Sequence, residues 1–447
     1  MSESKINILQ FGTGNFLRGF IEPMFQSLKD KGIWEPRIVL VQSTNSNSLK
    51  RLEETNFNYP LWLAGIQDGK EVNEEIKIDC INAGLKLLDQ TEAFLKLAES
   101  EELEFVISNV TEAGFKLEEE EEISLFPKSF PARLTLFLFK RFEFFEGDSS
   151  KGLQIFPCEL ISNNGDKLLE MVRDQSEKWN LPQEFKAWIN QYNSFYNTLV
   201  DRIIPGKPSE ETLKEFRPEL DLHPSRVQGE PYFFLGLEAK DKNVDKGILG
   251  DPDLNITFTQ DLTPYSLRKV RILNGAHIAM VALGLPKGIR TVGDFMRDDS
   301  LFLHLREMIE SEVIPVLPMD QDELKVYMEE IFDRFRNPFI EHKLRDISLN
   351  TIAKLSPRIL DSVQDYYQKF NRLPEKLTEV FIQSIDSYLK YPESIRDTEK
   401  VKAIFDQAGQ LKNPEEKADF LLDHPDLWNY ELSSLAGVRK RLVASIS

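Results

Sequence analysis

The feature that most constrains this chain is a glycine-containing turn between an apolar strand and a helix, close to the N-terminus. Residues 5–11 form a short apolar run typical of a buried strand, and Gly12 and Gly14 interrupt it before a helical pattern begins at Asn15. A second β-branched apolar run, 37–42, is again followed by helical residues. Strand, helix, strand and helix with short connections predict a Rossmann-type, doubly wound parallel α/β sheet.

The alternation continues to about residue 258, with one interruption. Residues 59–81 contain two extended stretches on either side of Asp68-Gly69, and an Asp-Gly pair is a strong β-hairpin signal. Further strands are predicted at 103–109 and 153–158, and further helices at 90–99, 131–145, 164–179 and 182–197.

Strand signals nearly vanish in the last part of the chain, where helical periodicity dominates from 262–285 onward. We therefore predict a dinucleotide-binding Rossmann-type domain over residues 1–258. A mostly α-helical C-terminal domain, carrying substrate-binding and catalytic residues, should occupy residues 259–447.

Charge and composition restrict the class of protein. The 447 residues include 55 basic and 74 acidic ones, a net charge of −19, which disfavours nucleic acid and anionic membranes as partners. No apolar run is long enough to span a bilayer, and no signal peptide is visible. Two cysteines fit a reducing compartment, so we expect a cytoplasmic enzyme, either a monomer or a small homo-oligomer. Five consecutive glutamates, Glu118–Glu122, are expected to be a solvated loop or helix face.

The Gly12-Thr-Gly14 turn lies where a dinucleotide-binding fold places its phosphate loop. Gly12 permits the tight turn, Gly14 permits close approach of a pyrophosphate, and the following helix offers its N-terminal N–H groups. Leu17 replaces the third glycine of the usual fingerprint, so an ordinary strand–helix turn is the alternative.

The ends of two other predicted strands are further candidates for contact with a dinucleotide. Gln42 and Ser43 follow the second strand, where an acid for the ribose hydroxyls is absent, so these residues leave NAD against NADP open. Asn109 and Thr111 follow the third strand and either line the ligand crevice or form a plain turn.

The segment that best indicates chemistry is a helix carrying Lys269, Asn274 and His277. At 100° per residue, Asn274 lies about 140° and His277 about 80° around from Lys269, so one broad face presents an amine, an amide and an imidazole. A desolvated lysine can exchange the proton of a secondary alcohol, an asparagine can stabilise an oxyanion, and a histidine can orient hydroxyls. The alternative is a surface lysine and a satisfied core histidine.

A basic segment stands out in this acidic chain. Residues 334–358 contain six lysines and arginines against two acids. The segment either binds a carboxylate or phosphate or forms a helix face paired with neighbouring glutamates; His342, Lys354 and Arg358 are our candidates for binding substrate. The five histidines and two cysteines form no metal-binding pattern, so no metal is expected.

Six motifs in order, ILQFGTGNFLRGF, SNVTEAGF, SFPARLT, PCELISNNGDKL, NTLVDRIIPG and KVRILNGAH, resemble the mannitol dehydrogenase family of polyol-specific long-chain dehydrogenases. The resemblance runs from residue 6 to about 440 and is closest to the branch that acts on uronates. It implies a Rossmann-type domain, a helical domain and metal-independent chemistry with NAD. It also implies reduction of D-tagaturonate by NADH to D-altronate in hexuronate breakdown.

The resemblance assigns residues to roles. It implies that Lys269 transfers the proton, that Asn274 stabilises the oxyanion, and that His277 is the third residue of the catalytic trio. It also implies a nucleotide loop that consists of Ile8, Leu9, Gln10, Phe11, Gly12, Thr13, Gly14, Asn15, Phe16, Leu17, Arg18 and Gly19.

One position departs from the polyol-oxidising relatives, which carry a second oxyanion asparagine where this chain has Leu160. The departure argues against a plain mannitol dehydrogenase. The alternatives are a fructuronate reductase, a neutral polyol dehydrogenase or, outside enzymes, a non-catalytic dinucleotide-binding sensor.

Overall fold

The computed structural model describes residues 6–111, 113–123, 126–239, 246–428, 432, 435 and 437–447. Lys5, in the first predicted strand, and Glu112, in the second family motif, lie outside the described residues. The chain divides into two compact units: unit 1 is Met1–Ala64 with Glu71–Leu262, and unit 2 is Gly65–Lys70 with Thr263–Ser447. No described helix has the length and hydropathy needed to cross a membrane.

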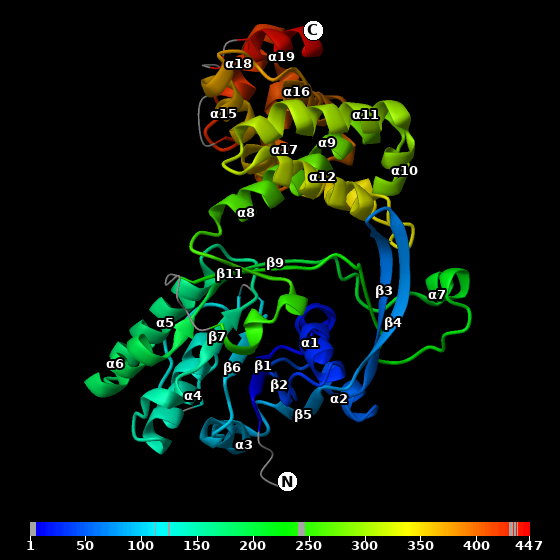
Figure 1. Cartoon of the computed structure of the whole chain (residues 1–447). Coiled ribbons are helices and arrows are strands. Elements are labelled where there is room, and N and C mark those ends of the chain that lie inside the picture. The colour runs from blue at the N-terminus through cyan, green and yellow to red at the C-terminus, as the bar shows by residue number, and fades with distance from the viewer. Residues whose placement is uncertain are drawn as a thin grey trace. The chain divides into compact units, whose positions relative to one another are not determined.

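A six-stranded parallel sheet organises unit 1 (Figure 1). Its strands lie in the order β5-β2-β1-β6-β7-β8, which in chain order is 3-2-1-4-5-6, the order of a dinucleotide-binding fold. Successive strands are added to one side of β1 up to β5 and to its other side from β6 onward, so the strand order reverses between β1 and β6, at the switch point where such folds bind ligands. The bounds are β1 (Ile8–Phe11), β2 (Ile38–Gln42), β5 (Ile81–Lys86), β6 (Phe105–Ser108), β7 (Gln154–Pro157) and β8 (Ser194–Phe195).

Both faces of this sheet are covered, because successive side chains of each strand point to opposite sides. Ile8 of β1 packs in one apolar cluster with α1 (Asn15–Asp30), whereas Leu9 and Phe11 pack in another with α4 (Phe130–Phe144) and α5 (Asn164–Lys178). The remaining helices of unit 1 are α2 (Ser48–Glu53), α3 (Thr91–Lys96), α6 (Gln183–Tyr192) and α7 (Glu210–Phe216).

Two smaller sheets also have most of their residues in unit 1, although the tip of the hairpin in one of them, Gly65–Lys70, belongs to unit 2. The predicted hairpin is confirmed as β3 (Tyr59–Gln67) and β4 (Lys70–Ile78), and Asp68 and Gly69 both have positive φ, as a type I′ turn requires. The hairpin pairs with β10 (Val227–Gly229). The third sheet contains β9 (Asn197–Asp201), β11 (Phe234–Glu238) and β12 (Ile256–Thr259).

One predicted helix is too long. The helix expected at 182–197 ends at Tyr192, and Asn193 is extended. The Asn193 side chain accepts the backbone N–H of Leu153 (3.0 Å) and donates to the Trp188 carbonyl (3.1 Å), which turns the chain into β8.

The described part of unit 2 from Thr263 onward is helical (Figure 1). At its centre, α9 (Gly275–Gly284) is buried on every side and contacts α11 (Asp299–Met308) and α16 (Glu375–Lys390). Other helices are α8 (Thr263–Arg268), α10 (Val292–Arg297), α12 (Gln321–Phe335), α13 (Leu344–Ile347), α14 (Thr351–Leu355), α15 (Asp361–Phe370), α17 (Glu399–Gln410), α18 (Pro414–Leu422) and α19 (Val438–Ile446).

Three segments within these helices are π-helical: η5 (Lys269–Asn274), η7 (Ile309–Val313) and η9 (Ser356–Leu360). Single π-helical turns are uncommon and occur frequently at functional sites. Two of them, η5 and η9, pack against each other and carry predicted site residues.

Candidate active site

The Gly12 turn joins the C-terminal end of β1 to α1. Gly12 has φ of +119°, and a Cβ there would lie 3.0 Å from the Asn109 carbonyl oxygen, so only glycine fits. Gly14 precedes the helix with open space around it, and no side chain caps the N-terminus of this 16-residue helix. The turn therefore offers backbone N–H groups and a positive helix end to an anion.

The predicted loop residues divide into an exposed part and a buried part. Gly14 and Asn15 are exposed and Gly12 and Phe16 half-buried, whereas the other eight, Thr13 among them, are buried. Gln10 donates to Glu22 (2.9 Å) and to the Gly12 carbonyl (3.0 Å). The Arg18 guanidinium lies over the Tyr59 ring and donates to the Ser225 carbonyl. The buried residues therefore support the turn from the protein interior.

Gln42 at the end of β2 braces the loop that follows it. Its side-chain oxygen accepts from the backbone N–H of Leu49 (3.0 Å), and its amide donates to the carbonyls of Thr44 and Ser46 (both 2.9 Å). Ser43 is half-buried beside it. Gln42 thus fixes the shape of the loop that follows β2.

The ends of β6 and β7 are joined by side-chain hydrogen bonds. Asn109 donates to the Cys158 carbonyl (2.7 Å), and the Thr111 hydroxyl accepts from the backbone N–H of Gly114 (3.3 Å). Leu160, at the position of the missing asparagine, is 78% exposed. The C-terminal ends of four neighbouring parallel strands, β2, β1, β6 and β7, thus carry the predicted residues along one edge of the sheet.

In unit 2, Lys269 and Asn274 begin and end η5, and His277 follows in α9. The expected 140° separation is wrong, because it assumes α-helical geometry. The backbone N–H of Gly275 reaches the Val270 carbonyl five residues back. In such a turn, residues five apart share a face, as residues four apart do in an α-helix, so Lys269 and Asn274 point to the same side.

His277 is a buried, neutral imidazole. Burial, together with the positive charges of His342, Arg334, Arg358 and Lys354, holds its pKa well below the usual value. Its ring lies against those of Phe335 and His342, with centroids 4.8 and 4.9 Å away. Among the described residues its Nε2 has no hydrogen-bond partner, which is unusual for a buried nitrogen and fits a substrate hydroxyl.

The groups whose charges act on His277 form what we call the basic cluster: Arg334, His342, Lys354 and Arg358. Within the described part of the chain, His342, Lys354 and Arg358 form no ion pair, although Lys354 donates to the Ile347 carbonyl (2.9 Å). Burial lowers the pKa of all three groups. Lys354 and Arg358 are thus half-buried cations without a paired carboxylate, which suits an anionic ligand, and the His342 imidazole, neutral near pH 7, can donate a hydrogen bond to it.

Sequence reasoning missed two residues here. Arg334 lies in the basic segment, but its burial (5% exposed) and its effect on His277 become visible only in the fold. A Cβ on Gly275 would lie 2.9 Å from the Arg358 carbonyl oxygen, so this glycine lets η5 and η9 approach closely. The motif LNGAH contains Gly275, and its partner on η9 has no signal in the sequence.

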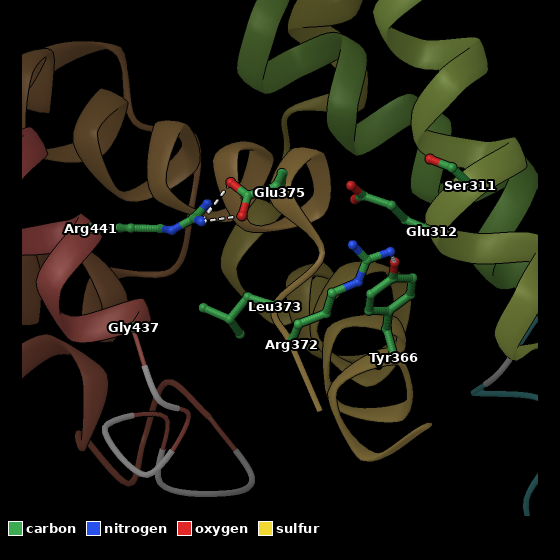
Figure 2. Close-up of a pocket in the computed structure, with 8 residues that line it drawn as sticks. All are labelled: Ser311, Glu312, Tyr366, Arg372, Leu373, Glu375, Gly437 and Arg441. Carbon is green, nitrogen blue, oxygen red and sulfur yellow. Dashed lines mark hydrogen bonds and ion pairs between the residues drawn. The ribbon is translucent and has the colours of Figure 1, made fainter. Parts of the chain in front are cut away.

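A separate cavity of about 420 Å³ in unit 2 contains neither these residues nor the trio Lys269, Asn274 and His277 (Figure 2). Its carboxylates are already bound: Glu375 accepts from Arg441, and Glu312 accepts from backbone N–H groups at the start of α16. We assign the site to the trio and the basic cluster instead. No group of three potential metal ligands occurs among the residues described.

Comparison with known proteins identifies the fold and the family of the chain. Residues 6–245 match the model of the mannitol dehydrogenase Rossmann domain, and residues 261–442 match the mannitol dehydrogenase C-terminal domain. The chain is 37% identical to altronate oxidoreductase of Bacillus subtilis over 445 residues, covering 98% of this chain and 92% of that protein. An Escherichia coli altronate oxidoreductase is 34% identical, with coverage of 96% and 92%.

Two solved structures share the fold. Mannitol 2-dehydrogenase of Pseudomonas fluorescens, in a ternary complex with NAD and D-mannitol, has a TM-score of 0.69 at 20% identity, covering 100% of this chain and 91% of that one. A substrate-free D-sorbitol dehydrogenase has a TM-score of 0.77 at 19% identity, with coverage of 98% and 92%. The predicted fold class and family are confirmed.

Proposed function

The chain belongs to the mannitol dehydrogenase family and is an oxidoreductase, and we propose that it reduces a hexuronate ketone, D-tagaturonate, to D-altronate with NADH. The observation that carries the substrate class is the basic cluster around His277, in which two half-buried cations, Lys354 and Arg358, lack an ion-paired carboxylate among the described residues. A neutral polyol gives such a cluster no counter-charge, whereas a sugar acid does. The altronate oxidoreductases among the relatives support the same substrate.

Lys269 and Asn274 act at the ketone in this proposal. Bound NADH supplies the hydride. As the carbonyl carbon is reduced, negative charge develops on its oxygen, where the Asn274 amide N–H stabilises it. The Lys269 ammonium then transfers its proton to that oxygen to give the alcohol. Their shared face on η5 supports action on one atom.

His277 acts on the substrate hydroxyls. A neutral imidazole both donates and accepts hydrogen bonds, and the His277 Nε2, which has no partner among the described residues, is open to a substrate hydroxyl. Because the imidazole is neutral, it also adds no further positive charge to the basic cluster.

Arg358, Lys354 and His342 receive the substrate carboxylate, with Arg334 behind them. An arginine can bind both carboxylate oxygens, and each hydrogen bond to a charged group contributes about 1.5–3 kcal/mol. Arg334 is buried and interacts with Glu330. It therefore acts on the substrate carboxylate through its electrostatic field and makes no direct contact with it.

The dinucleotide binds at the C-terminal edge of the unit 1 sheet. The fit rests on the uncapped N-terminus of α1, the space at Gly14, and the close approach of Gly12 to Asn109. These groups would hold the pyrophosphate of the bound dinucleotide, and Ser43, beside Gln42, would be available to its adenosine ribose. No acid there excludes a 2′-phosphate, so the preference for NADH rests on the family.

A panel of substrates tests the proposal. NADH oxidation should be measured with D-tagaturonate, D-fructuronate and neutral ketohexoses, and repeated with NADPH. We expect the highest kcat/KM for a uronate. Turnover of fructose at the rate of tagaturonate would remove the argument from the basic cluster, and a lack of turnover with every ketone offered would favour a dinucleotide sensor.

A further inference from the structure

Glu159 is a buried carboxylate that the proposed chemistry does not use. It follows β7 and Cys158, at the edge where the dinucleotide is proposed to bind, and is only 4% exposed. One carboxylate oxygen accepts from the backbone N–H of Val110 (2.9 Å), and the other accepts from the Ser108 hydroxyl (3.2 Å). Glu159 therefore holds the end of β6 from the neighbouring strand.

The backbone of Glu159 is itself fixed. The Asn164 amide donates to the carbonyls of Glu159 (3.1 Å) and Pro157 (2.7 Å), and its oxygen accepts from the backbone N–H of Thr198 (2.8 Å). The β7 side is therefore held independently of the carboxylate, and the contacts that depend on its charge are those to Ser108 and Val110.

The segment held by Glu159 touches the phosphate turn. A Cβ on Gly12 would lie only 3.0 Å from the Asn109 carbonyl oxygen, so this peptide lies close against the turn and leaves room for glycine alone. Because interiors are close-packed, a shift of the Asn109–Val110 peptide displaces Gly12.

We propose that Glu159 is a positioning residue for the dinucleotide: its ionised carboxylate holds the Asn109–Val110 peptide against Gly12 and so sets the shape of the phosphate turn. The inference rests on the proposed binding of NADH at this edge. It assigns Glu159 no contact with the substrate or with the reacting atoms.

The ionisation of Glu159 makes the proposal testable by pH. Burial raises its pKa to about 7, against the opposing effect of its hydrogen bonds to Val110 and Ser108. The adjacent titratable group is the Cys158 thiol, whose pKa burial raises well above the usual value, so it stays neutral. Within the part of the chain that the structure describes, no charged group is among the causes of the Glu159 pKa shift. Between pH 8 and 6, Glu159 takes up a proton and loses the charge that strengthens both hydrogen bonds.

The test is the dissociation constant of NADH, measured by fluorescence titration from pH 6 to 8. In the native protein we expect affinity to fall as pH falls through about 7. In Glu159→Gln, which resembles the protonated form, we expect affinity about tenfold weaker at pH 8, the effect of one hydrogen bond to a charged group, and nearly independent of pH. The control is Glu104→Gln, because burial also raises the pKa of Glu104, which precedes the opposite end of β6.

A second measurement needs no variant. Hydrogen exchange of the Val110 amide in the native protein should lose protection below pH 7, after correction for intrinsic rates. NADH affinity that is unchanged in Glu159→Gln, or Val110 protection that is independent of pH, would overturn the role of Glu159. A native protein that binds no NADH at any pH overturns the proposed function instead.

Discussion

Replacing Arg358 with glutamine tests the basic cluster most sharply. The change removes one positive charge and its hydrogen bonds while keeping most of the side-chain volume. Arg358 has no ion-paired carboxylate among the residues described, and burial lowers its pKa, so the folded protein already disfavours the charge. We therefore expect thermal stability to be unchanged or slightly raised.

The expected effect on catalysis follows from the hydrogen bonds to the carboxylate. Losing one bond to a charged group costs about 1.5–3 kcal/mol, which lowers kcat/KM for D-tagaturonate roughly 10- to 150-fold. The slow reduction of a neutral ketohexose should change by less than about threefold, since that substrate has no carboxylate to lose.

The assay compares both substrates by NADH oxidation at fixed pH, with Arg345→Gln as the matched control. Arg345 is a basic residue of the same segment, but it is exposed. An equal loss on the neutral and the acidic substrate in Arg358→Gln would refute carboxylate binding and indicate a general structural role.

Three further variants test the trio and its packing. Lys269→Ala should lower kcat by roughly 10²- to 10⁴-fold, the contribution of general acid–base catalysis, with the Kd of NADH unchanged. An unchanged kcat would refute the role of Lys269 in proton transfer. The buried His277 has a lowered folded pKa, so the unfolded state binds more protons and stability falls as pH drops below about 6.5. His277→Asn should flatten this part of a plot of Tm against pH, and an identical slope would contradict burial of a neutral imidazole. Gly275→Ala should push η9 away, because its Cβ would lie 2.9 Å from the Arg358 carbonyl oxygen. We expect the free energy of unfolding in denaturant to fall by about 1–3 kcal/mol and the KM for the uronate to rise. Native values of both quantities would refute this packing.

The sheet of unit 1 could be predicted because its signals are local. Apolar runs such as 37–42 and the turn at Gly12 need only their own residues to be recognised, and a parallel sheet then follows from the alternation with helices. The Asp68-Gly69 turn is similar, since positive φ at two successive positions selects these residues.

Other features depend on partners far away in the chain. Glu121, predicted to be solvated with its neighbours, is buried and accepts from the backbone N–H groups of Lys128 and Ser129 at the start of α4. The π-helical turn that begins at Lys269 packs against η9, nearly ninety residues later, and periodicity reveals neither the turn nor this contact. The residue types of the candidate site and their broad common face were therefore predictable, whereas the π-helical geometry that brings Lys269 and Asn274 closer together was not.

The basic segment, residues 334–358, was likewise predictable only in part. Its charge reversal is visible in the sequence, but pairing with glutamates was an equal alternative. Only the fold places Arg358 and Lys354 near a buried histidine rather than in ion pairs.

The most direct test of the proposed reaction is isotopic. The protein is incubated with D-tagaturonate and NADH carrying deuterium at the transferable position, and the product is analysed by NMR and mass spectrometry. The proposed function predicts D-altronate with one deuterium at the former ketone carbon and one NADH oxidised per product molecule. A product without deuterium at that carbon, or oxidation of NADH without D-altronate, would contradict it.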